Sequence, residues 1–347
     1  MKLSARTANG IAIACVTVAA LALTGCGGSG HKKSTTSSTP TPTTSSSTPT
    51  PTPAKPVVQP VNPLTGLRPS SNRVVAVKID DTANGRPQVG TNYADIVYIE
   101  EVEGGLTRLL AVFNTHLPTV EAVRSTRAGD PEILAEYGPI AYVASGGSRN
   151  PLQVLDKSNL KASINDRGGP GFARDGGRPA PYNLRANLNT IANVMKGARE
   201  RNVGLTWSKS IANAPVGKGT TVQTRVGGTP VQFNWDAKLN RYVRLIDGNV
   251  QHTANGALID TPNVIVQFCN VTVYTKDRDV LGNPNKYTHT VGRGKAVVFR
   301  NGHRIVGTWY RPTLASGTKF LDSHGKQIPL SPGGAWVVLT STSAPLA

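Results

Sequence analysis

Short runs of apolar residues, separated by polar turns, dominate the chain from residue 74 onward and predict strands interleaved with helices. The first run, 74–79, is rich in β-branched residues and ends at Asp80 and Asp81, which is typical of a buried strand. Similar runs follow at 96–99, 109–113 and 140–144. Their continuous apolar character indicates strands that are covered on both faces.

A helix start lies between the third and fourth runs. Asp130 is placed as an N-cap, Pro131 occupies the first helical position, and Glu132 puts a negative charge in the first turn. The helix is short and is expected to end near Gly138. Strands alternating with helices favour an α/β domain with a mostly buried, mixed or parallel sheet.

The pattern changes after residue 158. Residues 159–181 are rich in Gly, Arg and Pro, which predicts a long mobile loop. An amphipathic helix should follow, capped by Asn183 and ending near Asn202, with one apolar face formed by Leu184, Leu188, Ile191 and Met195.

From residue 220 onward short alternating runs predict a mainly antiparallel β domain, so that the second half is α+β in character. Two hairpin signals, Asp247-Gly248 and Asn301-Gly302, separate some of these runs. A partly closed barrel would accommodate them. The expected strands lie at 231–235, 242–246, 264–274, 296–299, 305–310 and 336–339.

The first 25 residues have the pattern of a secretory signal. Lys2 and Arg6 precede an apolar run, 11–23, which is shorter than the roughly 20 residues of a membrane-spanning helix. The sequence Leu23-Thr24-Gly25-Cys26 is typical of a lipobox, in which Cys26 receives a diacylglyceryl group carrying acyl chains such as palmitate and becomes the mature N-terminus. We therefore expect a protein anchored to the cell membrane by lipid, on the extracytoplasmic face.

A tether follows Cys26. Of the 30 residues from 27 to 56, 16 are Ser or Thr and 6 are Pro, so the segment cannot bury enough apolar surface to fold. Glycosylation of this tether is left open by the sequence. The predicted organisation is a signal peptide, a lipidated tether, an α/β domain and a β-rich domain, at 1–25, 26–56, 57–205 and 206–347.

The formal net charge of +18 is unevenly distributed. Residues 57–150 carry 8 Lys and Arg against 10 Asp and Glu, whereas residues 151–347 carry 25 against 10, a net +15. Such an excess favours an anionic partner, and outside a membrane this means anionic lipid, a wall polymer or an acidic glycan. Nucleic acid is not expected, because no binding motif occurs and aromatic residues are only 5% of the chain.

Candidate binding residues lie where the predicted strands end. In a parallel arrangement the segments after 79, 99 and 144 reach the same edge of the sheet, where open α/β folds bind ligands. Arginines there offer planar forks for carboxylate or phosphate. The candidates are Asp80, Arg86, Glu103, Arg108, Arg124, Ser125, Arg127 and Ser148. The alternative is a structural ion network between these arginines and the nearby glutamates.

Signals for standard enzyme chemistry are sparse, and catalytic residues cannot be assigned. The six histidines lack metal-ligand spacing, so neither a metal nor a cofactor is expected. Cys269 lies in a strand-like run and is expected to be a small buried apolar residue. The one enzymatic alternative is a glycan hydrolase or transferase that uses the carboxylates Asp80, Glu100, Glu101 and Glu103.

Ten ordered motifs resemble those of the YerB-like bacterial lipoproteins, a family catalogued as domain of unknown function 3048. The motifs cover nearly all of residues 60–342: Asn62–Gly66, Val75–Asp80, Arg86–Gln88, Ala94–Tyr98, Glu103–Arg108, Val123–Arg127, Gly146–Ser148, Asn263–Gln267, Gly307–Tyr310 and Pro332–Trp336. Two departures are Lys78, where an apolar residue is commoner, and Arg149, where Pro is commoner. The resemblance implies a two-part fold and an envelope lipoprotein, but it supplies no reaction.

Three functions remain open from the sequence. The first, which we favour over catalysis, is binding of an anionic or polar ligand of the cell envelope. The second is the hydrolase or transferase described above. The third is a scaffold that holds another envelope protein through the basic β-rich half.

Overall fold

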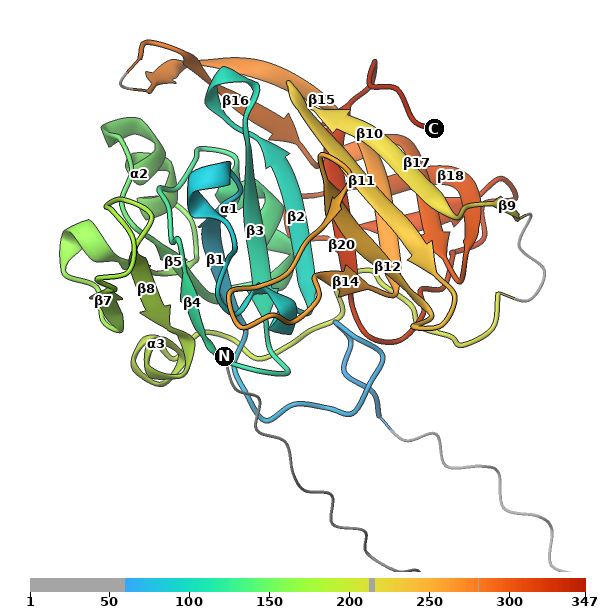
Figure 1. Ribbon diagram of the computed structural model, residues 1–347, viewed down its shortest axis with the longest axis horizontal. Helices are drawn as coiled ribbons and strands as arrows, with labels where there is room; N and C mark the ends of the chain where they lie inside the picture. The colour runs from blue at the N-terminus through green and yellow to red at the C-terminus, as the bar shows by residue number, and fades with distance from the viewer. Residues whose placement is uncertain (1–59, 212–215, 280) are drawn as a thin grey trace, which may run out of the picture. The chain divides into compact units, whose positions relative to one another are not determined.

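Most strands of the protein join one large sheet that runs through both halves of the chain (Figure 1). The computed structural model describes residues 60–347 apart from 212–215 and 280. The 12-stranded sheet has the order β19-β18-β17-β15-β20-β2-β3-β1-β5-β6, with β16 and β9 pairing beside this path. Its path ends at β19 and β6, so the described strands form an open sheet instead of the partly closed barrel suggested for the second half. The reason is that β20, instead of closing the second half, pairs with β2 of the first half.

The first half confirms the predicted α/β arrangement. The four apolar runs form β1 (Val75–Asp80), β2 (Ile96–Glu101), β3 (Thr107–Phe113) and β5 (Ala141–Ala144). β3 is antiparallel to both β1 and β2, and β5 is parallel to β1. β1, β2 and β5 therefore run in the same direction, and their carboxyl ends meet at one edge of the sheet.

Alternation along these strands divides the interior into two cores. Odd-numbered residues such as Val77 and Ile99 pack on one face, and even-numbered residues such as Ala76 and Leu110 pack on the other. Both faces are buried, which explains why the strands are apolar without interruption. The one basic residue in β1, Lys78, lies on the even face and is fully buried.

Helix α1 (Asp130–Leu134) begins as predicted with Pro131 in its first turn, continues as a 3-10 turn (Ala135–Tyr137) and ends at Gly138. Its N-cap position is Gly129 instead of Asp130, because the Asp130 carboxylate faces the interior. Helix α2 (Arg149–Asp156) was not predicted. It follows β5 directly, after Ser148.

Residues 159–181 do not form one long loop. β6 (Lys161–Ile164) pairs with β5, and β7 (Phe172–Arg174) pairs with β8 (Leu184–Asn187), so sheet pairing orders a segment rich in glycine. β4 (Thr119–Glu121) completes the three-stranded sheet β4-β8-β7.

The predicted amphipathic helix is shorter than expected. α3 (Leu188–Met195) is capped by Asn187, whose Oδ1 accepts from Thr190 N at 2.9 Å, and not by Asn183. Leu184 and Ala186 are buried as alternate residues of strand β8, which is why Leu184 also fits a helical stripe. Lys196, at φ 49°, ends the helix.

The second half is mainly antiparallel, and all six predicted runs form strands. Asn301 and Gly302 have φ values of 51° and 71°, as a tight hairpin turn between β17 and β18 requires. The strands are β9 (Gly217–Lys218), β10 (Thr221–Val226), β11 (Thr229–Asp236), β12 (Arg241–Ile246), β13 (Asn249–Val250), β14 (Asp260–Thr261), β15 (Asn263–Arg278), β16 (Pro284–His289), β17 (Gly292–Arg300), β18 (His303–Arg311), β19 (Lys319–Asp322) and β20 (Ala335–Ser341).

A smaller sheet, β10-β11-β12-β13 with β14 beside β12, packs against the large one. Cys269 in β15 is buried as predicted, and burial raises the pKa of its thiol to about 12. The domain boundary at 205/206 stays a prediction. The signal, Cys26 and the tether lie outside the described residues.

Candidate functional site

The carboxyl ends of β1, β2 and β5 bring together most of the predicted site residues. Register places Arg108 of β3 opposite both Asp80 and Glu100. The loop after β4 adds two more arginines. Arg127 contacts the Glu103 carboxylate through Nη2 and Nε, at 2.7 and 2.5 Å. Arg124 Nε lies 3.5 Å from Asp80 Oδ2. We refer to Asp80, Glu103, Arg108, Arg124 and Arg127 as the edge cluster.

Positive charge exceeds negative charge in the edge cluster, which holds three guanidinium groups and two carboxylates. Burial lowers the pKa of Arg108, and the guanidinium groups of Arg127 and Arg124 lower it further. Arg108 Nη1 donates to the Ser125 carbonyl at 3.0 Å, while Arg124 lies over the ring of Tyr182. The cluster thus favours the approach of further negative charge.

Three predicted site residues, Arg86, Ser125 and Ser148, are not members of the edge cluster. The Ser125 carbonyl accepts from Arg108 and Arg127, while the Ser125 hydroxyl lies 3.3 Å from that of Ser145. Arg86 Nε donates to the Thr82 carbonyl at 3.1 Å, and no contact joins Arg86 to the cluster in the part of the chain that the structure describes. Ser148 donates instead to the carboxylate of Asp277, which belongs to β15 of the second half.

A buried charge network that the sequence did not predict supports the loop between β4 and α1. The Asp130 carboxylate accepts from Lys78 Nζ at 2.6 Å, Thr126 Oγ1 at 3.1 Å, Arg127 N at 2.9 Å and Tyr142 Oη at 2.5 Å. Lys78 also contacts Glu100. Burial lowers the pKa of Lys78 to about 8, and Asp130 opposes this shift. The one sequence feature that could have indicated this network is Lys78, because it is a charged residue within an otherwise apolar strand.

All four carboxylates of the enzymatic alternative have a cationic neighbour. Asp80 and Glu103 lie against Arg124 and Arg127, and Glu100 lies against Lys78. Glu101 Oε1 is 3.6 Å from Lys286 Nζ. Across the described residues, no group of three or more His, Cys, Asp or Glu side chains could hold a metal ion.

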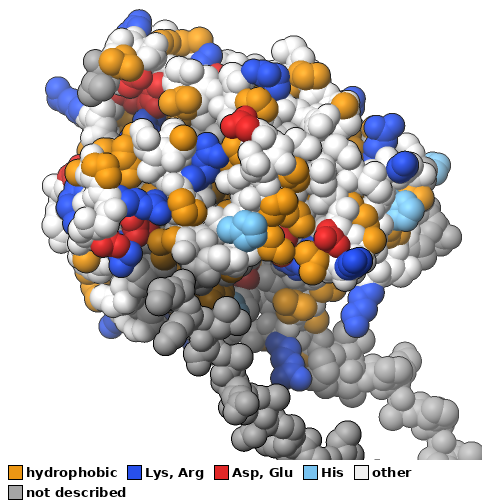
Figure 2. All heavy atoms as spheres, in the orientation of Figure 1, with side chains coloured by type: hydrophobic (Ala, Val, Ile, Leu, Met, Phe, Trp, Pro, Cys, Tyr) orange, Lys and Arg blue, Asp and Glu red, His pale blue; other side chains and the backbone are white. Residues whose placement is uncertain are grey.

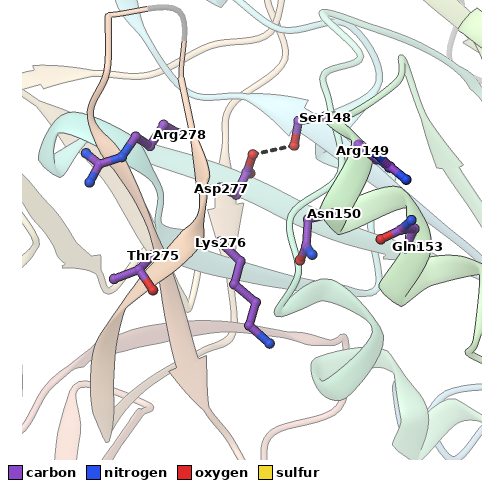
Figure 3. Close-up of a pocket in the computed structure, with 8 residues that line it drawn as sticks. All are labelled: Ser148, Arg149, Asn150, Gln153, Thr275, Lys276, Asp277 and Arg278. Atoms are coloured by element: carbon purple, nitrogen blue, oxygen red, sulfur yellow. Dashed lines mark hydrogen bonds between the residues drawn. The ribbon is translucent and has the colours of Figure 1, made fainter.

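An open pocket of about 560 Å³ lies between helix α2 and strand β15 (Figure 3). The β15–β16 hairpin extends over the first half of the chain and brings β15 against α2 (Figure 1). The first half contributes Ser148, Arg149, Asn150 and Gln153, and the second half contributes Thr275, Lys276, Asp277 and Arg278. Of these, the sequence predicted only Ser148, because a site between sequence-distant segments requires the fold.

Charge in this pocket is predominantly positive. Arg149, Lys276 and Arg278 are all exposed. The single acidic residue, Asp277, is 8% exposed and accepts from Ser148 and from Asn285 Nδ2, the latter at 3.0 Å. In Figure 3, Ser148 and Asp277 face each other across the gap, with Arg149 and Arg278 on opposite sides. The arrangement suits an extended anion that contacts both walls.

Family models match most of the chain. Residues 64–202 match the N-terminal domain of the protein family of unknown function DUF3048, and residues 220–337 match its C-terminal domain. The chain belongs to the DUF3048 family. As a member, it is 27% identical over 296 residues to the protein named "Putative lipoprotein YerB" from Bacillus subtilis (strain 168), covering 79% of this chain and 84% of that protein.

The fold of this DUF3048 member also matches a solved structure. The crystal structure of the YerB protein from Bacillus subtilis superposes with a TM-score of 0.69 at 22% identity, covering 83% of this chain and all of that chain. The match confirms the fold class: a mixed sheet in the first half followed by mainly antiparallel strands. Among the residues that have described positions, no helix is long and apolar enough to cross a membrane.

Proposed function

We propose that this protein is a lipoprotein, anchored through Cys26 to the extracytoplasmic face of the cell membrane, that binds an anionic polymer or acidic glycan of the cell envelope. The sequence Leu23-Thr24-Gly25-Cys26 supports the anchor, as does the lipoprotein name of the Bacillus subtilis relative. We assign this ligand to the pocket between α2 and β15, which Arg149, Lys276 and Arg278 line.

The observation that carries the proposal is the availability of two of these cations, since Arg278 already donates to the Gly282 carbonyl at 2.7 Å. Arg149 and Lys276 have no hydrogen bond or ion pair to other described residues, whereas Arg108 and Arg127 are buried and engaged. Asp277, the only acid among the described residues that line the pocket, is already held by Ser148 and Asn285. A negative ligand would therefore meet free positive charge and no competing free carboxylate.

The edge cluster has a supporting role in this proposal. Arg127 and Arg108 fix the strand ends through Glu103 and the Ser125 carbonyl. Lys and Arg side chains are spread over the face in Figure 2 without forming one continuous patch. A defined pocket consequently offers a better basis for recognition than overall charge.

Replacing Arg149, Lys276 and Arg278 together by alanine is expected to weaken binding to an immobilised anionic wall polymer by at least about tenfold. Charge-assisted hydrogen bonds contribute roughly 1.5–3 kcal/mol each, and loss of about 1.4 kcal/mol is tenfold. Because all three side chains are exposed, the melting temperature should hardly change.

The matched control replaces three exposed cations outside the pocket, Lys238, Arg304 and Lys326, by alanine. It removes the same net charge and should bind nearly as well as the unaltered protein. Equal loss in both triple variants would show that only overall charge matters, which would refute the proposed site.

A further inference from the structure

A second cavity, of about 230 Å³, lies at the opposite edge of the large sheet, where β2 and β20 begin side by side. Three distant segments are held together there by backbone hydrogen bonds. Gly333 N donates to the Thr65 carbonyl at 2.7 Å, and Ala335 N donates to the Asp95 carbonyl at 3.0 Å. Gly334, at φ 97°, passes so close to the Asp95 carbonyl that a side chain could not be accommodated. The cavity is thus part of the folded framework.

Residues lining this cavity carry buried polar atoms without partners. Within the described part of the chain, Thr91 Oγ1 and Asn92 Oδ1 make no hydrogen bond. Thr91 as a whole is only 1% exposed. Leaving such a group unpaired in the interior is unfavourable, so two of them beside one cavity indicate a polar occupant that pairs with them.

Charge in the cavity does not favour an anion. Arg241 is paired with Asp260. The Asp95 carboxylate accepts from Asn114 N and Thr115 N at 2.5 and 2.8 Å, and burial raises its pKa. In contrast to the pocket between α2 and β15, no free cation lines this one among the described residues.

Aromatic rings lie at the same cavity. Tyr93 is 40% exposed and meets the His116 ring edge-on, with centroids 5.5 Å apart. Trp336 also lines the cavity. An exposed ring beside hydroxyl and amide groups can stack on an apolar face while the polar groups bond the ligand's edge.

We propose that this cavity binds one neutral sugar ring. A pyranose carries hydroxyls around its edge, which can pair with Thr91 and Asn92, and apolar C–H faces, which can pack on Tyr93. The volume is below the roughly 300–1,000 Å³ of sites for larger ligands, consistent with a single ring. This site shares no residue with the anion pocket and goes beyond the function proposed above.

Binding is tested on the full chain with N-acetylglucosamine as the probe, by isothermal titration and saturation-transfer NMR. Thr91→Val keeps the side-chain shape and removes the unpartnered hydroxyl; Tyr93→Ala removes the exposed ring. Each should weaken binding by about fivefold to tenfold. Tyr310→Ala, which removes another partly exposed ring on β18, is the control and should not change the affinity.

Thr91→Val also separates a binding role from a structural one. If the hydroxyl serves a ligand, the variant should unfold at the same or a higher temperature, because a buried unpaired polar atom has been removed. A lower melting temperature with unchanged binding would overturn the proposal, as would the absence of binding or tighter binding of glucuronic acid. Failure of the sugar-site proposal would not affect the proposed anion pocket, because the variants that test the anion pocket replace different residues.

Discussion

Ending the chain after Gly334 is expected to abolish cooperative folding. The deletion removes β20, which pairs in parallel with β15 from Val264 to Cys269 and with β2 from Ile96 to Ile99. Both strands would then expose unpaired edges in the middle of the sheet.

The energetic argument rests on four side chains of β20. Trp336, Val337, Val338 and Leu339 are each at most 4% exposed. Burying a large apolar side chain contributes about 1.5–3 kcal/mol, so losing four removes roughly 6–12 kcal/mol, comparable with the entire stability of a typical protein. Urea denaturation followed by circular dichroism should show no sharp transition.

Ending the chain after Ser341 provides the control, because it retains the whole of β20. This shorter deletion should keep a cooperative transition. If the chain ending at Gly334 also unfolded cooperatively, the first half would be able to fold without the strand that the second half supplies, contrary to the sheet order described here.

Asp130→Ala is expected to reduce the free energy of unfolding by about 3–5 kcal/mol, because it leaves a buried charge with one of its partners missing. Lys78 is fully buried, and the Asp130 carboxylate also pairs with Tyr142 and with the loop at Thr126 and Arg127. The loss should therefore affect both stability and the position of Arg127. Urea denaturation measures the first effect.

A matched variant shows whether the loss of stability in Asp130→Ala comes from the missing charge partner of Lys78 or from the missing side-chain volume. Lys78→Met, Glu100→Gln and Asp130→Asn together remove every charge of the network, and this triple variant should be more stable than Asp130→Ala. A triple variant as unstable as Asp130→Ala would mean that the charges themselves are not the cause. A loss below about 1 kcal/mol in Asp130→Ala would mean that the network contributes little.

The sequence predicted the buried strands of the first half more reliably than the segments that connect them. Continuous apolar runs identified β1, β2, β3 and β5 and the shared edge of their carboxyl ends, because burial on both faces leaves a clear local pattern. The spacing of Leu184 fits the apolar face of α3 and predicts a helix there, although Leu184 belongs to β8. Only the pairing of β8 with β4 and β7 decides between these structures.

The candidate site was predicted in part for the same reason. Arg108, Arg124 and Arg127 follow from strand order, and the structure brings them together with Asp80 and Glu103. Arg149, Lys276 and Arg278 could not be found, because they come from segments more than 120 positions apart that meet only when β15 reaches α2. Which arginine of the edge cluster pairs with which carboxylate likewise depends on distances in the folded protein, and these cannot be read from the sequence.

Hydrogen exchange of the protein with and without an anionic wall polymer tests the proposed function most directly, because exchange locates the ligand without any substitution. Slower exchange is predicted in the segments 148–153 and 275–278, which form the two walls of the pocket. The exposed basic segments around Lys238, Arg304 and Lys326 should be unchanged. Protection confined to those basic segments, with none at the pocket, would contradict the proposal.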